Sequence, residues 1–239
     1  NFILSDSNFI TFRENVTDQL LNLIYDYDGP TMYYRSKLNI EGVKDIYIVG
    51  GDTAFFIMNN GDLYAVGNRP GLGKGSNSEY PYTVIAWEPT KVAGLSNVKK
   101  VVGDNNDIYA ITENGDVYGW GYNYNGILGT ETSAFVYTPT KISGLSNVKD
   151  IVMTYETRFA IMNDGTVKGW GYTRGGQVPI QGQGIQGQGI QGQGIQGQGN
   201  IIKIPTTIPS LTNVKKIYSA PNSGEFFYAL HENNSVTVW

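Results

Sequence analysis

A segment of about fifty residues recurs along this chain, and this period constrains the fold more than any other feature of the sequence. Residues 94–101, Gly-Leu-Ser-Asn-Val-Lys-Lys-Val, recur at 144–151 and, more loosely, at 210–217, and an earlier copy lies at 42–46. Periods of roughly 20 to 50 residues are typical of solenoids, propellers and other repeat architectures. The period therefore predicts a series of similar units, each packed mainly against its neighbours.

Two further features recur in step with this segment. Residues 109–121 match residues 159–171, since both hold an Ala-Ile pair, a turn glycine and the tripeptide Gly-Trp-Gly. Each unit then closes on a stretch that begins with proline: Pro89-Thr90-Lys91-Val92, Pro139-Thr140-Lys141-Ile142 and Pro205-Thr206-Thr207-Ile208.

One insertion interrupts the period. Trp120 and Trp170 are 50 residues apart, whereas Trp170 and Trp239 are 69 residues apart. Residues 180–199 are four copies of Ile-Gln-Gly-Gln-Gly, and without these 20 residues the second spacing is 49. We predict one domain over 1–239 with five units, the first degenerate and the last cut short: 1–37, 38–92, 93–142, 143–208 and 209–239.

The inserted pentapeptides have no charge and no aromatic residue, so they cannot bury a core of their own. A flexible surface loop between the third and fourth strands of unit four is the expected arrangement. Two alternatives remain open: a recognition loop of variable length, and a glycine-rich extended strand that packs through its isoleucines.

Residue types within a unit favour short β-strands. Runs of branched and aromatic residues occupy 98–102 and 108–112. Asn-Gly or Asp-Gly, the dipeptides of hairpin turns, follow such runs at 60–61, 114–115 and 164–165. We expect type I′ turns, in which both central residues have positive φ. Each unit then holds about four antiparallel strands, named a to d in chain order, which is typical of a propeller blade.

The unit resembles the repeat of the regulator of chromosome condensation, RCC1. The resemblance is carried by Asn-Gly-Asp-Val-Tyr-Gly-Trp-Gly at 114–121, by Asn123, by Gly-Ile-Leu-Gly at 126–129 and by Pro-Thr-Lys-Ile at 139–142. It covers residues 38–239 well. It implies an all-β, RCC1-like β-propeller of about five units with four-stranded antiparallel blades, of a bacterial or viral type. Because RCC1-like propellers commonly have seven blades, either blades are missing from this piece or the ring closes differently.

Composition excludes several functions. A net charge of −4, with 16% charged residues, disfavours nucleic-acid binding, because phosphate backbones are bound by clustered positive charge. No stretch of eighteen apolar residues is present, so we expect no membrane insertion. The chain has no cysteine and a single histidine, His231. We therefore predict no catalytic residue, no cofactor and no metal site.

The order of the strands places the variable loops together. In a blade that runs a, b, c, d, the a-to-b and c-to-d connections emerge on one face of the propeller, which we call the loop face. Residues 68–88, 122–137 and 172–204 lie there, and the other face carries the tight turns. Aromatic side chains with asparagine give a large contact area and adaptable hydrogen bonds. The predicted partner-binding residues are Tyr80, Tyr82, Trp87, Tyr122, Asn123, Tyr124, Phe135 and Tyr137. Packing of single aromatics over blade edges is the alternative for each.

Structural roles account for the other conspicuous residues. Trp120 and Trp170 recur at one repeat position, which favours the same packing role in each blade. Asp62 follows a turn glycine, where turn chemistry explains a carboxylate. Residues 71–75, Gly-Leu-Gly-Lys-Gly, lack the spacing and hydroxyl of a phosphate-binding loop. His231 is expected in an exposed turn, without a partner for general-base chemistry.

Three functional hypotheses follow. The first is a non-enzymatic binding module that presents its aromatic loops to a protein or a glycan, on a secreted, cell-surface or virion protein and compatible with an oligomer or larger assembly. RCC1-like propellers include nucleotide-exchange factors and enzyme inhibitors. The second hypothesis is therefore a guanine-nucleotide exchange factor or effector that acts on a small GTPase. The third is an inhibitor that caps the active site of another enzyme.

Overall fold

The computed structural model describes nearly all of the repeated units and little of the N-terminal segment. The described residues are 22–23, 33–34, 40–49, 53–68, 85–104, 106–130, 135–154, 157–173, 200–219 and 227–238. Tyr80, Tyr82 and the glycines at 71–75 therefore lie outside the described residues, as does the insertion 180–199.

The strands fall into four successive sheets of the expected kind, which we call blades 2 to 5 after the units that contain them. Blade 2 consists of β3 (Val43–Val49), β4 (Thr53–Met58), β5 (Leu63–Asn68) and β6 (Ile85–Lys91). Blade 3 consists of β7 (Val98–Gly103), β8 (Asp107–Thr112), β9 (Val117–Gly121) and β10 (Val136–Lys141). Blade 4 consists of β11 (Val148–Met153), β12 (Thr157–Met162), β13 (Val167–Thr173) and β14 (Asn200–Thr207).

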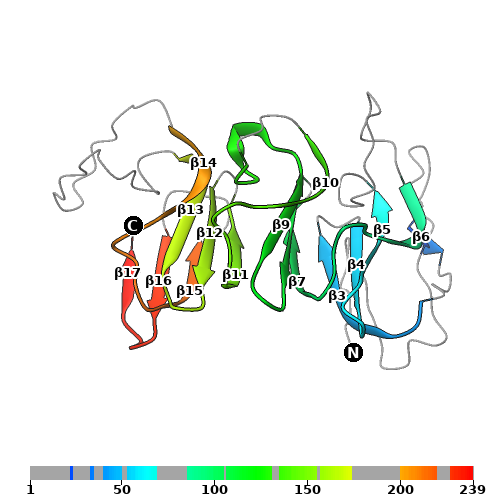
Figure 1. Ribbon diagram of the computed structural model, residues 1–239, viewed down its shortest axis with the longest axis horizontal. Coiled ribbons are helices and arrows are strands. Elements are labelled where there is room, and N and C mark those ends of the chain that lie inside the picture. The colour runs from blue at the N-terminus through cyan, green and yellow to red at the C-terminus, as the bar shows by residue number, and fades with distance from the viewer. Residues whose placement is uncertain are drawn as a thin grey trace.

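Blade 5 has three described strands, β15 (Val214–Ser219), β16 (Phe227–His231) and β17 (Val236–Val238). In the first unit, β1 (Asn22–Leu23) pairs with β2 (Tyr33–Tyr34). All of these neighbouring strands pair antiparallel and in chain order. The blades stand side by side in a row, with the connection from β9 to β10 at the top and the tight turns along the bottom (Figure 1). The predicted all-β fold of four-stranded antiparallel blades is confirmed.

The hairpin turns between strands b and c form where predicted, but the predicted turn type is wrong. Gly61, Gly115 and Gly165 have φ near +80°, while the Asn or Asp before each of them does not have positive φ. In blade 3 the Gly115 N–H donates to the Thr112 carbonyl at 2.8 Å, and the Thr112 N–H donates to the Asp116 carbonyl at 3.0 Å. This is the three-residue loop closed by a glycine in the left-handed region, in which only one residue needs positive φ.

The carbonyl of each turn glycine also accepts a hydrogen bond from the backbone of the next blade. The Val148 N–H donates to the Gly115 carbonyl at 2.9 Å, and Val98 and Val214 make the same bond to the preceding blade. Asn147, with φ of 60°, lies so close that a Cβ on Gly115 would be 2.6 Å from its Cα. Glycine is required here because any side chain would collide with the backbone of the neighbouring blade. We call this arrangement the turn clasp.

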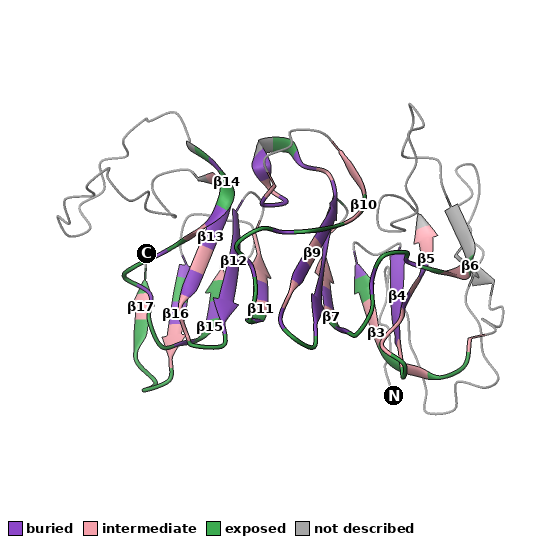
Figure 2. Cartoon of the chain, viewed as in Figure 1, coloured by how far each residue is buried: buried purple, intermediate pink, exposed green. Residues whose placement is uncertain are grey.

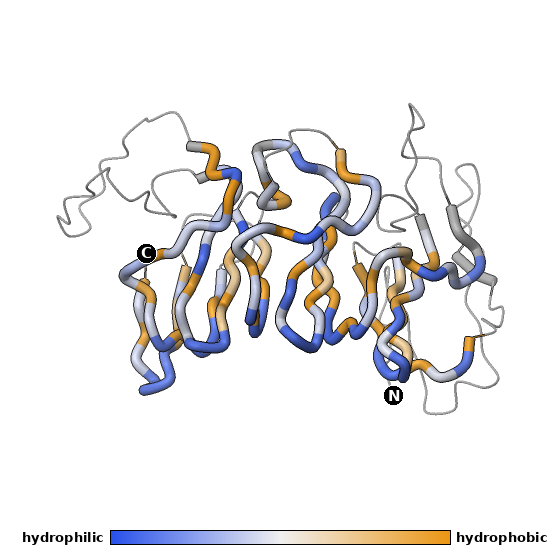
Figure 3. The backbone as a smooth tube through the Cα atoms, viewed as in Figure 1, coloured by the Kyte–Doolittle hydropathy of each residue, from blue (hydrophilic) through white to orange (hydrophobic). Residues whose placement is uncertain are grey.

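The hydrophobic core lies between the blades. Figure 2 shows the buried residues concentrated along the strands, and Figure 3 shows that the turns at the bottom are hydrophilic. Trp120 and Trp170 are both 0% exposed. Each packs edge-on against an aromatic residue of the preceding blade, Phe55 for Trp120 at 6.0 Å and Tyr109 for Trp170 at 6.1 Å between ring centroids. The packing role predicted from their recurrence is confirmed.

Candidate functional site

The candidate site is the connection from β9 to β10 on blade 3, at the top of Figure 1. The chain leaves β9 at Gly121, whose φ of +112° brings its backbone against Asn106. The Tyr122 N–H then donates to the Asn106 carbonyl at 2.8 Å. A short 3₁₀ turn, η4 (Tyr124–Gly126), follows before the chain returns to β10. The base of the loop is therefore fixed to the a-to-b connection of its own blade.

Asn123 gives the loop its shape. Its side chain is 1% exposed, its Oδ1 accepts the Leu128 N–H at 3.0 Å, and its Nδ2 donates to Thr130 Oγ1 at 2.8 Å. Leu128 is fully buried beneath the loop. Asn123 was predicted to contact a partner, but the structure turns this side chain inward, where a buried amide satisfies the loop's own polar groups. It positions the aromatic residues around it.

A second anchor fixes the loop to the neighbouring blade. The Ile127 carbonyl accepts a hydrogen bond from Trp170 Nε1 at 2.7 Å and another from the Tyr109 hydroxyl. Trp170 belongs to blade 4 and Tyr109 to blade 3, and both are 0% exposed. Burial and the nearby Asp107 carboxylate raise the pKa of Tyr109 well above its ordinary value, so this hydroxyl stays a donor.

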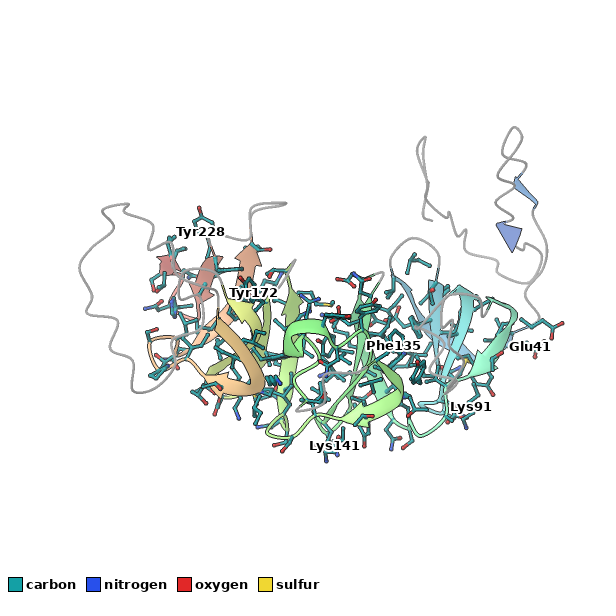
Figure 4. All side chains as sticks on the ribbon, turned by 90° about the horizontal axis from the view of Figure 1, so that it is seen from above. Glu41, Lys91, Phe135, Lys141, Tyr172 and Tyr228 are labelled. Carbon is teal, nitrogen blue, oxygen red and sulfur yellow. The ribbon has the colours of Figure 1, made fainter. Side chains whose placement is uncertain are left out.

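Four of the predicted aromatic residues form one continuous cluster, which we call the aromatic cluster. Tyr122 stacks on Tyr124 with ring centroids 5.2 Å apart, and it meets Phe135 edge-on at 5.6 Å. Phe135 in turn lies 4.6 Å from Tyr137. Tyr124 is 69% exposed, and the other three are half-buried. In Figure 4 Phe135 lies over blade 3, in the middle of the row of sheets.

The chemistry of the cluster suits contact with a partner. Aromatic rings carry a large apolar area, and tyrosine adds a hydroxyl that can donate or accept a hydrogen bond. The ring of Tyr124 stacks on Tyr122 and the residue is 69% exposed, so a contact with this ring costs little conformational entropy. The sequence predicted these four residues as separate candidates, and the structure brings them together.

The remaining predicted site residue, Trp87, lies in strand β6 of blade 2, and its side chain is outside the described residues. His231 is half-buried instead of freely exposed. Its Nδ1 lies 2.7 Å from the Thr212 carbonyl and its Nε2 lies 2.8 Å from Thr237 Oγ1. Both ring nitrogens are therefore engaged in holding the turn of blade 5.

A buried ion pair between blades 3 and 4 was not predicted from the sequence. Arg158 and Asp107 are both 0% exposed, and the guanidinium donates through Nη2 to Oδ1 at 2.7 Å and through Nε to Oδ2 at 3.1 Å. Burial opposes the charge of Arg158, but the facing carboxylate outweighs it and raises the pKa of the guanidinium above its ordinary value. Arg158 occupies the repeat position of Ile108, and this break in the apolar pattern was the available signal.

Two features are absent from the described residues. No group of three or more acidic or histidine side chains there could hold a metal ion. Nor does that part of the chain form a helix long and apolar enough to span a membrane.

Comparisons with known proteins identify the fold. The family model "Regulator of chromosome condensation (RCC1) repeat" matches residues 114–155. Yeast RCC1 (Prp20), solved bound to Kap60, is similar with a TM-score of 0.63 and 19% identity, over 92% of this chain and 51% of that chain. Prp20p from Saccharomyces cerevisiae gives a TM-score of 0.61 and 20% identity, over 86% and 47%. Human WBSCR16 gives 0.60 and 23% identity, over 87% and 50%.

The blades, their clasps and these likenesses define an RCC1-type β-propeller fold. The resemblance to the RCC1 repeat inferred from residues 114–142 is confirmed, while the bacterial or viral type stays a prediction. The chain spans about half the length of the solved structures that it matches.

Proposed function

We propose that this chain is a non-enzymatic interaction module that binds a partner protein through the aromatic cluster on its loop face. The supporting observation is the geometry of Tyr122, Tyr124, Phe135 and Tyr137, four aromatic rings in sequential contact on a loop fastened to two blades. Clustered, rigidly held aromatic residues are the usual centre of a binding surface. A glycan is the alternative ligand for the same rings.

The similar structures support a protein as the partner. Yeast RCC1 (Prp20) was solved bound to Kap60, and Prp20p from Saccharomyces cerevisiae has binding properties to Gsp1p and histones. Those partners belong to those proteins. For this chain, the partners of those proteins indicate only that propellers of this fold bind other proteins. The location of this module on a secreted, cell-surface or virion protein is part of the proposal.

Truncation of the cluster tests the proposal. We expect Tyr124→Ala together with Tyr122→Ala to weaken binding of any captured partner by roughly tenfold to thirtyfold, as for a central aromatic contact. Tyr218→Ala is the matched control, because Tyr218 is also an exposed tyrosine, at 49%, but lies on β15 of blade 5. Binding is measured by calorimetry on the purified partner, and a glycan array is probed in parallel. Equal affinity of the double variant and the control for every partner would refute the aromatic cluster as the binding surface.

The second candidate function is nucleotide exchange on a small GTPase. The observation in its favour is that Prp20p, which shares this fold, binds Gsp1p. Release of a fluorescent guanine nucleotide from a panel of small GTPases distinguishes the two functions. An interaction module without exchange activity leaves the release rate unchanged, whereas an exchange factor accelerates it. An inhibitor of another enzyme's active site, the third hypothesis, would act without such release.

A further inference from the structure

The turn between β16 and β17 has side chains that differ from those of the matching turns in the other blades. In blades 2, 3 and 4 the turn residues are Asn-Gly-Asp at 60–62, Asn-Gly-Asp at 114–116 and Asp-Gly-Thr at 164–166. Blade 5 has Asn-Asn-Ser at 233–235. The backbone keeps the same closing bond, because the His231 N–H donates to the Ser235 carbonyl at 2.9 Å, as the matching residues do in the other blades. Blade 5 therefore retains the turn and changes its chemistry.

Asn-Asn-Ser fits the acceptor sequence for N-linked glycans, which is asparagine, any residue but proline, and then serine or threonine. The matching turns of blades 2, 3 and 4 do not fit it, because they end in aspartate or begin with aspartate. The chain has one other sequence of this type, Asn-Val-Thr at 15–17, which lies outside the described residues. The turn of blade 5 is therefore the acceptor sequence whose structure is described.

The serine changes the hydrogen bonds of the asparagine as well. Asn233 Oδ1 accepts the Ser235 N–H at 3.0 Å and the Ser235 hydroxyl at 2.7 Å, and Asn233 Nδ2 donates to no described residue. In blade 3, by contrast, Asn114 Nδ2 donates to Asp116 Oδ2 at 3.4 Å, and the matching pair in blade 2 is 3.1 Å apart. Serine in place of aspartate thus leaves the amide nitrogen of Asn233 free of the turn.

The turn is accessible from solvent. Asn233, Asn234 and Ser235 are all exposed. Asn234 has φ of 63°, a conformation that asparagine adopts more readily than most residues, so it replaces the turn glycine of the other blades. In Figure 1 this turn lies at the bottom of blade 5, whereas the connection from β9 to β10 lies at the top. A group attached to Asn233 is therefore on the opposite face from the aromatic cluster.

We propose that Asn233 is the acceptor of an N-linked glycan. The donor is an oligosaccharide joined through a diphosphate to a lipid, and an oligosaccharyltransferase catalyses the transfer. A bond forms between Asn233 Nδ2 and C1 of the first sugar, while the bond from C1 to the diphosphate oxygen breaks. The lipid diphosphate leaves with the electron pair of that bond, one Nδ2 proton passes to a base of the transferase, and nothing is oxidised or reduced. Asn233 Oδ1 is not altered, so both of its hydrogen bonds to Ser235 are kept.

This proposal rests on one part of the proposed function, the location on a secreted or cell-surface protein, because N-linked glycans are typical of secreted proteins. It does not rest on the aromatic cluster. A glycan is bulky and hydrated. At Asn233 it would block contacts at the turn of blade 5 and leave the loop face open to a partner.

Secretion by cultured eukaryotic cells tests the proposal. The 239-residue chain is produced behind a cleavable signal sequence, with Asn15→Gln to remove the other acceptor sequence. We expect the secreted protein to carry the mass of one glycan and to lose it on treatment with peptide N-glycosidase, which converts the glycosylated asparagine to aspartate. Mass spectrometry of the peptides should place that aspartate at position 233. An unmodified Asn233 in secreted protein that unfolds in one cooperative transition would overturn the proposal.

Variants of the acceptor sequence then test its chemistry. Asn233→Gln and Ser235→Ala should each abolish the added mass, whereas Ser235→Thr should retain it, because threonine also supplies the hydroxyl. Asn114 is the matched control within the same chain, since it is exposed in the same kind of turn but is followed by Gly-Asp, and it should stay unmodified. A glycan that persists in Ser235→Ala, or one found on Asn114, would overturn the proposal.

One variant separates this proposal from the proposed binding function. The protein with Tyr122→Ala and Tyr124→Ala should carry the same glycan at Asn233 as the parent. If it does and still binds every partner as well as Tyr218→Ala does, the aromatic cluster is refuted and the glycan site stands. If Asn233 is unmodified, the glycan site is refuted whatever the affinity of the double variant.

Discussion

The interface between blades 2 and 3 and the interface between blades 3 and 4 are built on the same backbone from different chemistry. Between blades 3 and 4, Asp107 and Arg158 form a buried, two-point ion pair. The corresponding positions one blade earlier hold Thr53 and Ile108, both buried. The repeat therefore fixes where the blades meet, while each interface has its own residues in the middle. A buried charge pair of this type contributes more to the specificity of the contact between the two blades than to stability.

At the turns, by contrast, the two interfaces are alike. The Val98 N–H donates to the Gly61 carbonyl and the Val148 N–H donates to the Gly115 carbonyl, each at 2.9 Å. A Cβ on Gly61 or Gly115 would be 2.7 Å or 2.6 Å from the asparagine Cα of the next blade. Backbone contacts of this closeness leave no freedom for sequence change, whereas the side chains above them can vary.

Removal of one member of the ion pair should have the largest effect and separates the two interfaces most clearly. We expect Arg158→Ala to lower the free energy of unfolding by about 3–5 kcal/mol, because it leaves the Asp107 carboxylate buried without its partner. The double variant Asp107→Thr with Arg158→Ile copies the interface between blades 2 and 3 and should lie within about 1 kcal/mol of the parent. Denaturant unfolding measures both. A double variant as unstable as Arg158→Ala would show that the two interfaces are not interchangeable.

Substitution in the turn clasp should affect both interfaces equally. We expect Gly61→Ala and Gly115→Ala each to lower the free energy of unfolding by about 3 kcal/mol, because alanine strains the left-handed backbone and its Cβ collides with the next blade. Gly94→Ala is the matched control, since Gly94 has φ of +77° but nothing within 4 Å of its added Cβ. That control should cost only about 1–2 kcal/mol. Thermal unfolding of the three variants gives the comparison, and equal losses in all of them would contradict the clasp.

Loss of the Trp170 indole N–H donor should have a smaller effect on stability, confined to the interface between blades 3 and 4. Trp170→Phe leaves the Ile127 carbonyl with the Tyr109 hydroxyl alone, and we expect a loss of about 2 kcal/mol from the missing hydrogen bond and ring volume. The loop that carries Tyr124 should also become more susceptible to protease. An unchanged cleavage rate at that loop would show that this anchor does not hold the aromatic cluster.

The exposed ion pair between Asp62 and Lys91 should have the smallest effect. Lys91 Nζ lies 2.6 Å from Asp62 Oδ2, and this hydrogen bond holds the pKa of Asp62 below its ordinary value of 3.8. A carboxyl whose pKa is lowered on folding stabilises the protein above 3.8, and that contribution is lost as the pH falls through the lowered value. Asp62→Asn should therefore flatten the fall of melting temperature below about pH 4 slightly. If the melting temperature of Asp62→Asn falls as steeply at acid pH as that of the parent, groups other than Asp62 cause the fall.

Much of the fold could be predicted from residue patterns. The spacing of Trp120 and Trp170 and the Asn-Gly and Asp-Gly turns indicated four-stranded blades, because a hairpin signal and a strand period are local properties. The turn type could not be obtained in this way. An Asn-Gly dipeptide also fits a three-residue loop in which Gly115 alone has positive φ, so the dipeptide does not distinguish the two turn types.

The candidate site was predicted in part. Tyr122, Tyr124, Phe135 and Tyr137 were identified by type and loop position, but their contact with one another required the three-dimensional path of the loop. Asn123 was placed among them although it faces inward, because its burial depends on Leu128 and Thr130, which lie five and seven residues later.

The sequence by itself determined the period, the strands and the order of the blades, because these depend on residue types that repeat at fixed spacing. Tertiary structure alone decided which residues meet between blades: the pairing of Arg158 with Asp107, the two donors on the Ile127 carbonyl, and the exposure of Val236 where Val117 is buried. The physical reason is that burial is a property of the neighbour as well as of the residue, so identical repeat positions acquire different environments.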